Sequence, residues 1–92
     1  MKEKEKIVEL EEKELSFSDE PLVFGRAEDC DVCIEDTSMS QRHCAIRTWD
    51  DLLLIKDLNS TNGTKVNGLK IDRIAILKPG DKVQIGNVIF EI

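Results

Sequence analysis

Apolar residues in this 92-residue chain fall into short runs that are separated by turn-forming residues. Val83 and Ile85 alternate with polar neighbours, and this period of two is typical of a strand with one buried face. The runs are too short for ordinary helices, which average about 11 residues. We interpret the following runs as strands: Lys6–Leu10, Glu14–Phe17, Leu22–Phe24, Asp31–Ile34, Cys44–Trp49, Leu52–Lys56, Thr64–Val66, Lys82–Ile85 and Asn87–Ile92.

Turn signals stand between most of these runs. Asn-Gly is a strong hairpin signal because both turn residues take positive φ, so Asn62-Gly63 and Asn67-Gly68 each predict a hairpin. Many short strands joined by turns indicate an all-β sandwich or barrel. The Leu52–Ile55 run is apolar at successive positions, which predicts that both of its faces are covered.

The first fifteen residues are amphipathic and rich in Glu and Lys, a pattern that would also allow one helix. Leu10, Leu15 and Phe17 fit two edge strands equally well, and we interpret the segment in that way. We expect the charged residues 1–6 to fray and residues 7–92 to form a single domain, because a chain of this length supports one modest core.

The chain has a formal net charge of −6, with 40% apolar and 35% charged residues. This composition is typical of a soluble globular domain, and the negative charge argues against nucleic acid or an anionic membrane as a partner. Three cysteines are too few for a disulfide scaffold, and the first residues do not form a secretory signal. We therefore expect a cytoplasmic protein that acts as a monomer.

Polar residues with binding chemistry gather in the turns rather than in the strands. Gly25-Arg26 ends one expected strand, residues 40–43 precede another, and residues 59–64 precede a third. Arginine offers a planar fork of donors, and hydroxyl and backbone N–H groups can complete a shell around an oxyanion. Polar loops held at one end of a strand scaffold are typical of a recognition domain.

The order and spacing of three motifs resemble those of the forkhead-associated (FHA) domain family. They are Phe24-Gly25-Arg26, Ser40-x-x-His43, and Asp57-Leu58-x-Ser60-Thr61-Asn62-Gly63-Thr64-x-Val66-Asn67-Gly68. Lys78-Pro79-Gly80-Asp81 and the glycine at position 86 extend the match toward the C-terminus. Each motif alone is weak, whereas their combined order is specific.

The resemblance implies a sandwich of two mainly antiparallel sheets with about eleven short strands and ligand loops at one end. It also implies a phosphopeptide-binding module, not an enzyme, that recognises phosphothreonine in partner proteins without a cofactor. Carried over by position, Arg26, Ser40 and Thr61 would bind the phosphate. Asn62 would bind the peptide backbone, although it could also serve only to supply positive φ before Gly63.

Five further residues are expected around this site. In the family, the positions of Gly25, His43 and Gly63 are structural: a turn glycine before the arginine, a histidine that braces the phosphate loop, and a turn glycine after the asparagine. The residue after the motif serine is often Arg or Asn in the family, and here it is Gln41. Gln41 and Arg42 are candidate accessory contacts to the ligand.

Three other readings follow from the same residues. Cys30, Cys33, His43 and Cys44 are the residue types that bind zinc. However, His43 and Cys44 are adjacent at the start of an expected strand, where neighbouring side chains point to opposite sides, so both cannot easily reach one ion. Cys33 lies in another expected strand, where a buried thiol is typical, and we expect no metal. Ser40 and His43 could form a hydrolase pair, but the chain lacks a Gly-x-Ser-x-Gly elbow. The third reading is a phosphate-independent interaction or self-association module.

Overall fold

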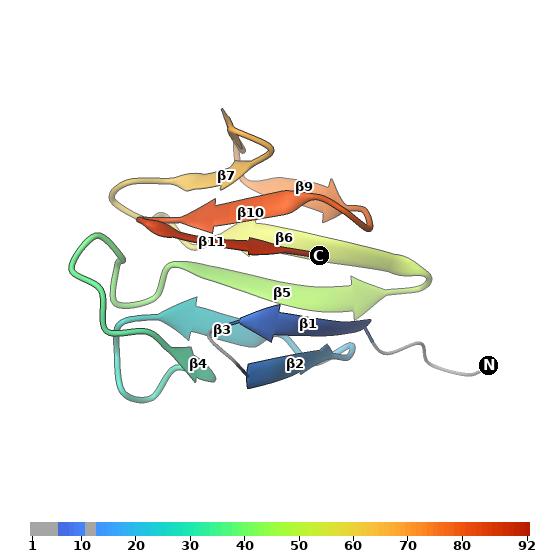
Figure 1. Cartoon of the computed structure of the whole chain (residues 1–92), viewed down its shortest axis with the longest axis horizontal. Coiled ribbons are helices and arrows are strands. Elements are labelled where there is room, and N and C mark those ends of the chain that lie inside the picture. The colour runs from blue at the N-terminus through green and yellow to red at the C-terminus, as the bar shows by residue number, and fades with distance from the viewer. Residues whose placement is uncertain (1–5, 11–12) are drawn as a thin grey trace.

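The computed structural model describes residues 6–10 and 13–92, which form strands and connecting loops without a helix (Figure 1). The predicted fraying of residues 1–6 falls almost entirely outside the described residues, and Lys6 already belongs to β1. No helix among the described residues could cross a membrane. The eleven strands are β1 (Lys6–Leu10), β2 (Lys13–Phe17), β3 (Leu22–Gly25), β4 (Val32–Cys33), β5 (Cys44–Trp49), β6 (Leu52–Asp57), β7 (Thr64–Val66), β8 (Leu69–Lys70), β9 (Ile74–Leu77), β10 (Lys82–Ile85) and β11 (Val88–Glu91).

The strands form two main sheets and one separate hairpin. A five-stranded sheet has the order β4-β3-β5-β6-β9, and a four-stranded sheet has the order β11-β10-β7-β8. All neighbours pair antiparallel except β3 and β4. The β1–β2 hairpin lies against β11 and β5. The predicted all-β sandwich of mainly antiparallel sheets is confirmed.

Alternating side chains build the core between the two sheets. In β5 the side chains of Cys44, Ile46 and Thr48 are buried, and their neighbours in the strand are more exposed. Phe24 of β3 stacks on Phe90 of β11 with ring centroids 5.6 Å apart, which joins one sheet to the other. Complete burial of an Ile or Phe side chain contributes roughly 1.5–3 kcal/mol to the stability of the fold, so the strands that carry the loops are well anchored in the core.

Two expectations about strands are wrong. Leu52 is 40% exposed and Leu54 is only half-buried, so one face of β6 is not fully covered as the apolar run predicted. Two strands are present that the sequence did not predict: β8, which has only two residues, and β9, an edge strand in which Ile74 and Ile76 are exposed. Neither strand shows the apolar–polar alternation that identifies a strand from sequence.

The two Asn-Gly dipeptides differ in structure. Asn67 and Gly68 have φ of 53° and 84° and close the β7–β8 hairpin, as predicted. Asn62 does not have positive φ, and the connection that contains it crosses from β6 in one sheet to β7 in the other. The prediction of a hairpin at Asn62-Gly63 is therefore wrong. The interpretation of Asn62 as only a source of positive φ is wrong for the same reason.

Candidate functional site

Strand register brings four connections to one end of the sandwich. The last pairs of β3, β5 and β6 align Phe24 with Cys44 and Cys44 with Asp57. In the other sheet Ile85 pairs with both Thr64 and Val88. The β3–β4, β4–β5, β6–β7 and β10–β11 connections therefore leave the sheets at the same end, on the left in Figure 1. The expected cluster of loops at one end is present.

Arg26 is exposed directly after β3, and two hydrogen bonds fix it against the β4–β5 connection. Its backbone N–H donates to the carbonyl of Ser40 at 3.0 Å, and its Nε–H donates to the carbonyl of Met39 at 3.1 Å. Both terminal NH2 groups remain available for an incoming acceptor. No carboxylate pairs with Arg26 among the side chains that the structure describes. The guanidinium is thus an oriented cation that is not neutralised by any carboxylate in the described part of the chain.

A hydrogen bond joins Ser40 to Thr61 across two connections that are remote in sequence. The backbone N–H of Thr61 donates to Ser40 Oγ at 2.9 Å. Because Oγ accepts in this bond, the Ser40 hydroxyl proton can still be donated to an anion. Thr61 is exposed beside it.

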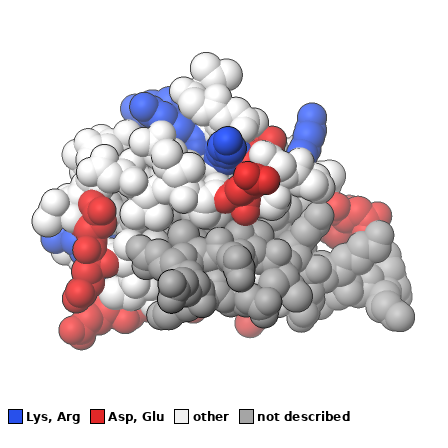
Figure 2. Space-filling model, viewed as in Figure 1, with Lys and Arg blue, Asp and Glu red and all other residues white. Residues whose placement is uncertain are grey.

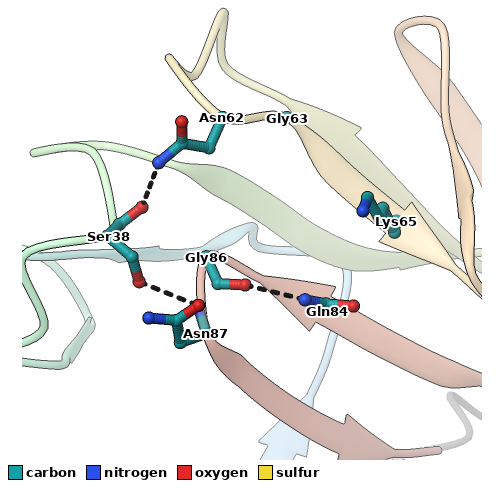
Figure 3. A pocket seen from close by; sticks show the side chains of 7 residues that line it. All are labelled: Ser38, Asn62, Gly63, Lys65, Gln84, Gly86 and Asn87. Carbon is teal, nitrogen blue, oxygen red and sulfur yellow. Dashed lines mark hydrogen bonds between the residues drawn. The ribbon is translucent and has the colours of Figure 1, made fainter.

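Asn62, the next residue along the chain, joins the same two connections. Its Nδ2 donates to the carbonyl of Ser38 at 2.9 Å (Figure 3). One amide hydrogen and the side-chain carbonyl remain, which is the donor–acceptor pair that a peptide backbone requires. The amide is exposed and held in orientation by this bond.

His43 is completely buried and holds the β4–β5 and β6–β7 connections together. Its Nε2 lies 2.8 Å from the carbonyl of Gly63, and its Nδ1 accepts the backbone N–H of Ser40 at 3.1 Å. A ring that accepts at Nδ1 and donates at Nε2 is neutral. Both ring nitrogens are therefore engaged with backbone groups, and neither bonds Ser40 Oγ. The hydrolase reading lacks the nucleophile–base contact that it requires.

Gly25 is needed for a close approach rather than for an unusual turn. A Cβ at this position would lie 2.1 Å from the carbonyl oxygen of Gln41 and 2.9 Å from Cys30 Sγ. Its φ is not positive, so the physical reason differs from the turn role that the resemblance implied. The absence of a side chain lets the β4–β5 connection lie directly against the end of β3.

The β6–β7 connection is held by Asp57, a residue of the third motif for which the sequence predicted no role. Its Oδ1 accepts the hydroxyls of Ser60 at 2.6 Å and Thr64 at 2.7 Å, and its Oδ2 accepts the backbone N–H of Ser60. Burial alone would raise the pKa of Asp57, but these bonds outweigh it and leave the pKa below the usual 3.8. Gly63 follows with φ of 84°, which suits glycine and ends the connection.

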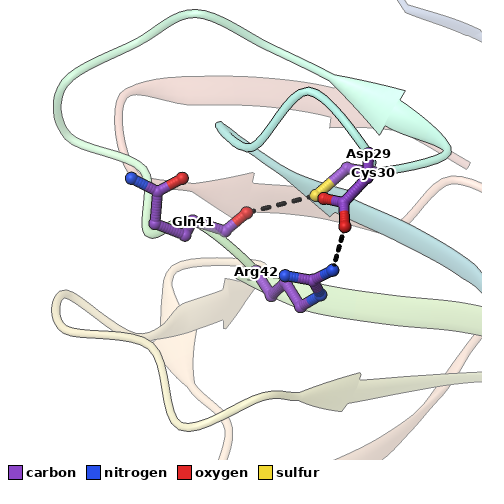
Figure 4. Close-up of polar contacts among 4 residues, drawn as sticks. All are labelled: Asp29, Cys30, Gln41 and Arg42. Carbon is purple, nitrogen blue, oxygen red and sulfur yellow. Dashed lines mark hydrogen bonds and ion pairs between the residues drawn. The ribbon is translucent and has the colours of Figure 1, made fainter.

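Gln41 and Arg42 differ in what they contact. The carbonyl of Gln41 accepts from Ala27 N–H at 3.1 Å and from the Cys30 thiol at 3.1 Å, while its exposed side chain points outward. The Arg42 guanidinium forms an exposed ion pair with Asp29 (Figure 4). A role for Arg42 at the ligand would require it to share or leave this pair, and both accessory roles stay predictions.

The cysteines do not form a cluster. Cys30 and Cys44 are buried, whereas Cys33 is exposed, so the expectation of a buried Cys33 is wrong. Burial raises the pKa of the Cys44 thiol far above its ordinary value. Among the described residues, no group of three or more His, Cys, Asp or Glu side chains is placed to hold a metal ion.

Fold and loops together define a β-sandwich with oriented hydrogen-bond donors at one end. A family model for the FHA domain matches residues 22–86, and the chain belongs to this family. FHA domains are binding modules rather than enzymes.

Three similar proteins illustrate the relationship. Mycobacterium tuberculosis FhaA is 41% identical over 66 residues, which are 71% of this chain and 12% of FhaA. Its FHA domain, solved in complex with the intracellular domain of Rv3910, is 30% identical with a TM-score of 0.84, covering 92% of this chain and 96% of that one. The mouse proliferation marker protein Ki-67 is 38% identical over 68% of this chain. A structure from work on phosphothreonine-dependent FHA domain interactions has a TM-score of 0.86 and 28% identity, covering 96% of this chain and 94% of that one.

The chain spans only a small part of the larger relatives, 2% of Ki-67 and 12% of FhaA. The similarity therefore concerns the FHA domain and not the other parts of those proteins.

Proposed function

We propose that this chain binds phosphothreonine in extended segments of partner proteins and so makes a protein–protein interaction depend on phosphorylation. One observation carries the proposal: an arginine, a serine hydroxyl and an asparagine amide come from three connections, and hydrogen bonds join these connections to one another. No carboxylate of the described residues pairs with the arginine. The similarity to a structure solved in work on phosphothreonine-dependent FHA domain interactions supports the same function.

In this proposal each group has one task. The two terminal NH2 groups of Arg26 bind phosphate oxygens, and charge-assisted bonds of this kind contribute about 1.5–3 kcal/mol each. The hydroxyls of Ser40 and Thr61 donate to the remaining oxygens. Asn62 binds the peptide backbone with its free amide hydrogen and carbonyl and so sets the position of the peptide. No step requires a cofactor or a metal.

The acidic chain does not conflict with an anionic ligand. Beyond a Debye length of about 8 Å, physiological salt largely screens exposed charges, so local groups decide the field at the loops. The −6 net charge instead supports the further proposal that nucleic acid and anionic membranes are not partners. The three free cysteines fit a reducing, cytoplasmic setting, and we propose that the domain acts there as a monomer.

The test is a degenerate phosphothreonine peptide library presented to the wild type and to Arg26→Ala. The proposal expects selective capture by the wild type and loss of capture by a folded Arg26→Ala protein. Capture that is unchanged in Arg26→Ala, or that is equal for unphosphorylated peptides, would count against it.

A phosphate-independent interaction surface is the second candidate. The outer face of the five-stranded sheet exposes Trp49, Ile74 and Ile76 at 55%, 58% and 50%, and exposed apolar side chains on one face favour protein contact. Binding of a partner that survives both dephosphorylation and Arg26→Ala would favour this candidate.

A further inference from the structure

We propose that the groove beside Asn62 is a second anion subsite, which selects phosphopeptides that carry another acidic side chain near the phosphothreonine. The inference rests on the proposed function, because it places the peptide backbone at Asn62. It is carried by charges and hydrogen bonds on the neighbouring strands β7, β8 and β10.

The groove has a volume of about 200 Å³ and runs between the β6–β7 and β10–β11 connections. Asn62, Lys65, Gln84 and Asn87 contribute its polar side chains, and Ser38 lies between Asn62 and Asn87, across from Lys65 and Gln84 (Figure 3). None of the described residues that line it carries a carboxylate. Since Asn62 is shared between the groove and the candidate phosphate site, a peptide held by Asn62 would extend over the groove.

Lys65 lines this groove, and Lys70 lies opposite it on the neighbouring strand. Lys65 of β7 pairs directly with Lys70 of β8, so their side chains share one face of the sheet. Both are exposed, and neither forms an ion pair with a side chain that the structure describes. The stem of Lys70 passes close to Gly63, where a Cβ would lie 2.5 Å from Lys70 Cε. Like charges directly opposite each other destabilise a sheet, and an anion between them would remove that cost.

The distribution of charge on the face shown in Figure 2 also favours an anion near β7. In Figure 2, most of the cationic side chains on this face lie over the upper part of the molecule, where Figure 1 places β7, whereas acidic side chains line the lower left, near the loops around β4, and others lie at the centre and right. An acidic peptide side chain is therefore favoured over the β7 side of the site and disfavoured over the β4 side.

Hydrogen bonds hold the groove walls in place before any ligand arrives. Asn87 N–H donates to Ser38 Oγ at 2.8 Å, and Gln84 Nε2 donates to the carbonyl of Gly86 at 3.0 Å. A Cβ on Gly86 would lie 2.4 Å from Ser38 Oγ, so only glycine allows this approach. The second amide hydrogen of Gln84 and the side chain of Asn87 remain available. Two ammonium groups and amide donors suit a carboxylate or a phosphate, and a basic side chain would be repelled.

The experiment uses a phosphothreonine peptide with a neutral background and scans one Asp through the four positions on each side. Dissociation constants are measured for the wild type, Lys65→Gln, Lys70→Gln and a control, Lys78→Gln, which changes an exposed lysine on the β9–β10 turn at the other end. We expect one Asp position to improve affinity about two- to fivefold over Ala, as for an exposed charge pair. The gain should disappear in Lys65→Gln, shrink in Lys70→Gln and persist in Lys78→Gln.

Two further peptides identify the source of the anion. Asn at the preferred position should give no gain, and phosphoserine there should equal or exceed Asp if a second phosphate is the natural group. A scan with no preferred acidic position, or a gain that survives both groove variants, overturns the subsite. If the parent peptide binds in an Arg26-dependent way, such a result leaves the proposed function intact. If the parent peptide does not bind, the proposed function itself fails.

Discussion

The two Asn-Gly dipeptides lie at opposite ends of β7 and show how differently the same residues can be used. Asn67-Gly68 closes a local hairpin, and the Asn67 side chain bonds Asp81 and the backbone N–H of Lys82. Asn62-Gly63 ends a crossing connection, with the Asn62 amide bonded to Ser38, 24 positions away. The first pair serves folding at one end of the sandwich, and the second holds an exposed amide at the ligand end.

The largest expected effect is at the ligand end, in Arg26→Ala. Loss of one or two charge-assisted bonds should weaken phosphopeptide binding on the order of 100-fold, or about 2.7 kcal/mol, with little change in stability because Arg26 is exposed. Isothermal calorimetry and a thermal melt measure the two quantities. Undiminished affinity in a folded Arg26→Ala protein would remove Arg26 from the site.

Asp57→Ala should damage both folding and binding, because Asp57 supports the crossing connection from inside. The change leaves the buried Thr64 hydroxyl without its partner and should cost about 2 kcal/mol of unfolding free energy. The lowered pKa gives the sign with pH: the ionised carboxylate stabilises the native state above about pH 4, and this stability is lost as the pH falls further. Denaturant unfolding at pH 7 and pH 3 should show a larger difference between wild type and variant at pH 7.

Binding should weaken about tenfold between pH 7.5 and pH 5, since the second phosphate ionisation has a pKa of about 6. Asp57 remains ionised at pH 5, so its support of the connection persists over that range. Calorimetry at both pH values measures the effect, and a thermal melt at pH 5 is the control. Equal affinities would show that the site does not require a dianion.

The two asparagines provide a matched pair of variants. Asn62→Ala should weaken binding about fivefold, near 1 kcal/mol, because it removes neutral hydrogen bonds to the peptide. Asn67→Ala should leave binding unchanged but cost about 1 kcal/mol of stability, because alanine is strained at positive φ. If both variants changed only the affinity, or both changed only the stability, the two ends of β7 would not have separate roles.

The smallest expected effect concerns the opposed lysines of β7 and β8. Lys70→Glu should raise stability by about 0.5 kcal/mol, because an opposite-charge pair replaces a repulsive one. The gain should decrease at high salt, as expected for exposed charges. A melting temperature that falls or is insensitive to salt would mean that Lys65 and Lys70 do not interact.

The strands and the order of the site motifs could be predicted because both depend on local pattern. Alternation in β5 and β10 marks one buried face, and the Asn67-Gly68 turn needs only its own two residues. The hairpin predicted at Asn62-Gly63 does not form, since Asn62 donates to the carbonyl of Ser38 and the carbonyl of Gly63 bonds His43, two contacts that no local pattern reveals.

Exposure at the surface was predicted less well for a related reason. Leu54 and Ile76 lie side by side on the outer face of a sheet, and nothing in the composition of their strands shows that this face is left partly open. The support from Asp57 could have been suspected from its spacing to Ser60, three residues on, which is typical of a carboxylate that accepts the backbone N–H of a following turn.

The most direct test of the central claim is a calorimetric titration of the wild type at pH 7.5 with one phosphothreonine peptide taken from the library and with its unphosphorylated twin. We expect a dissociation constant in the micromolar range, near −8 kcal/mol, for the phosphopeptide and binding at least about 100-fold weaker for the twin. Equal affinity for the two peptides would contradict it.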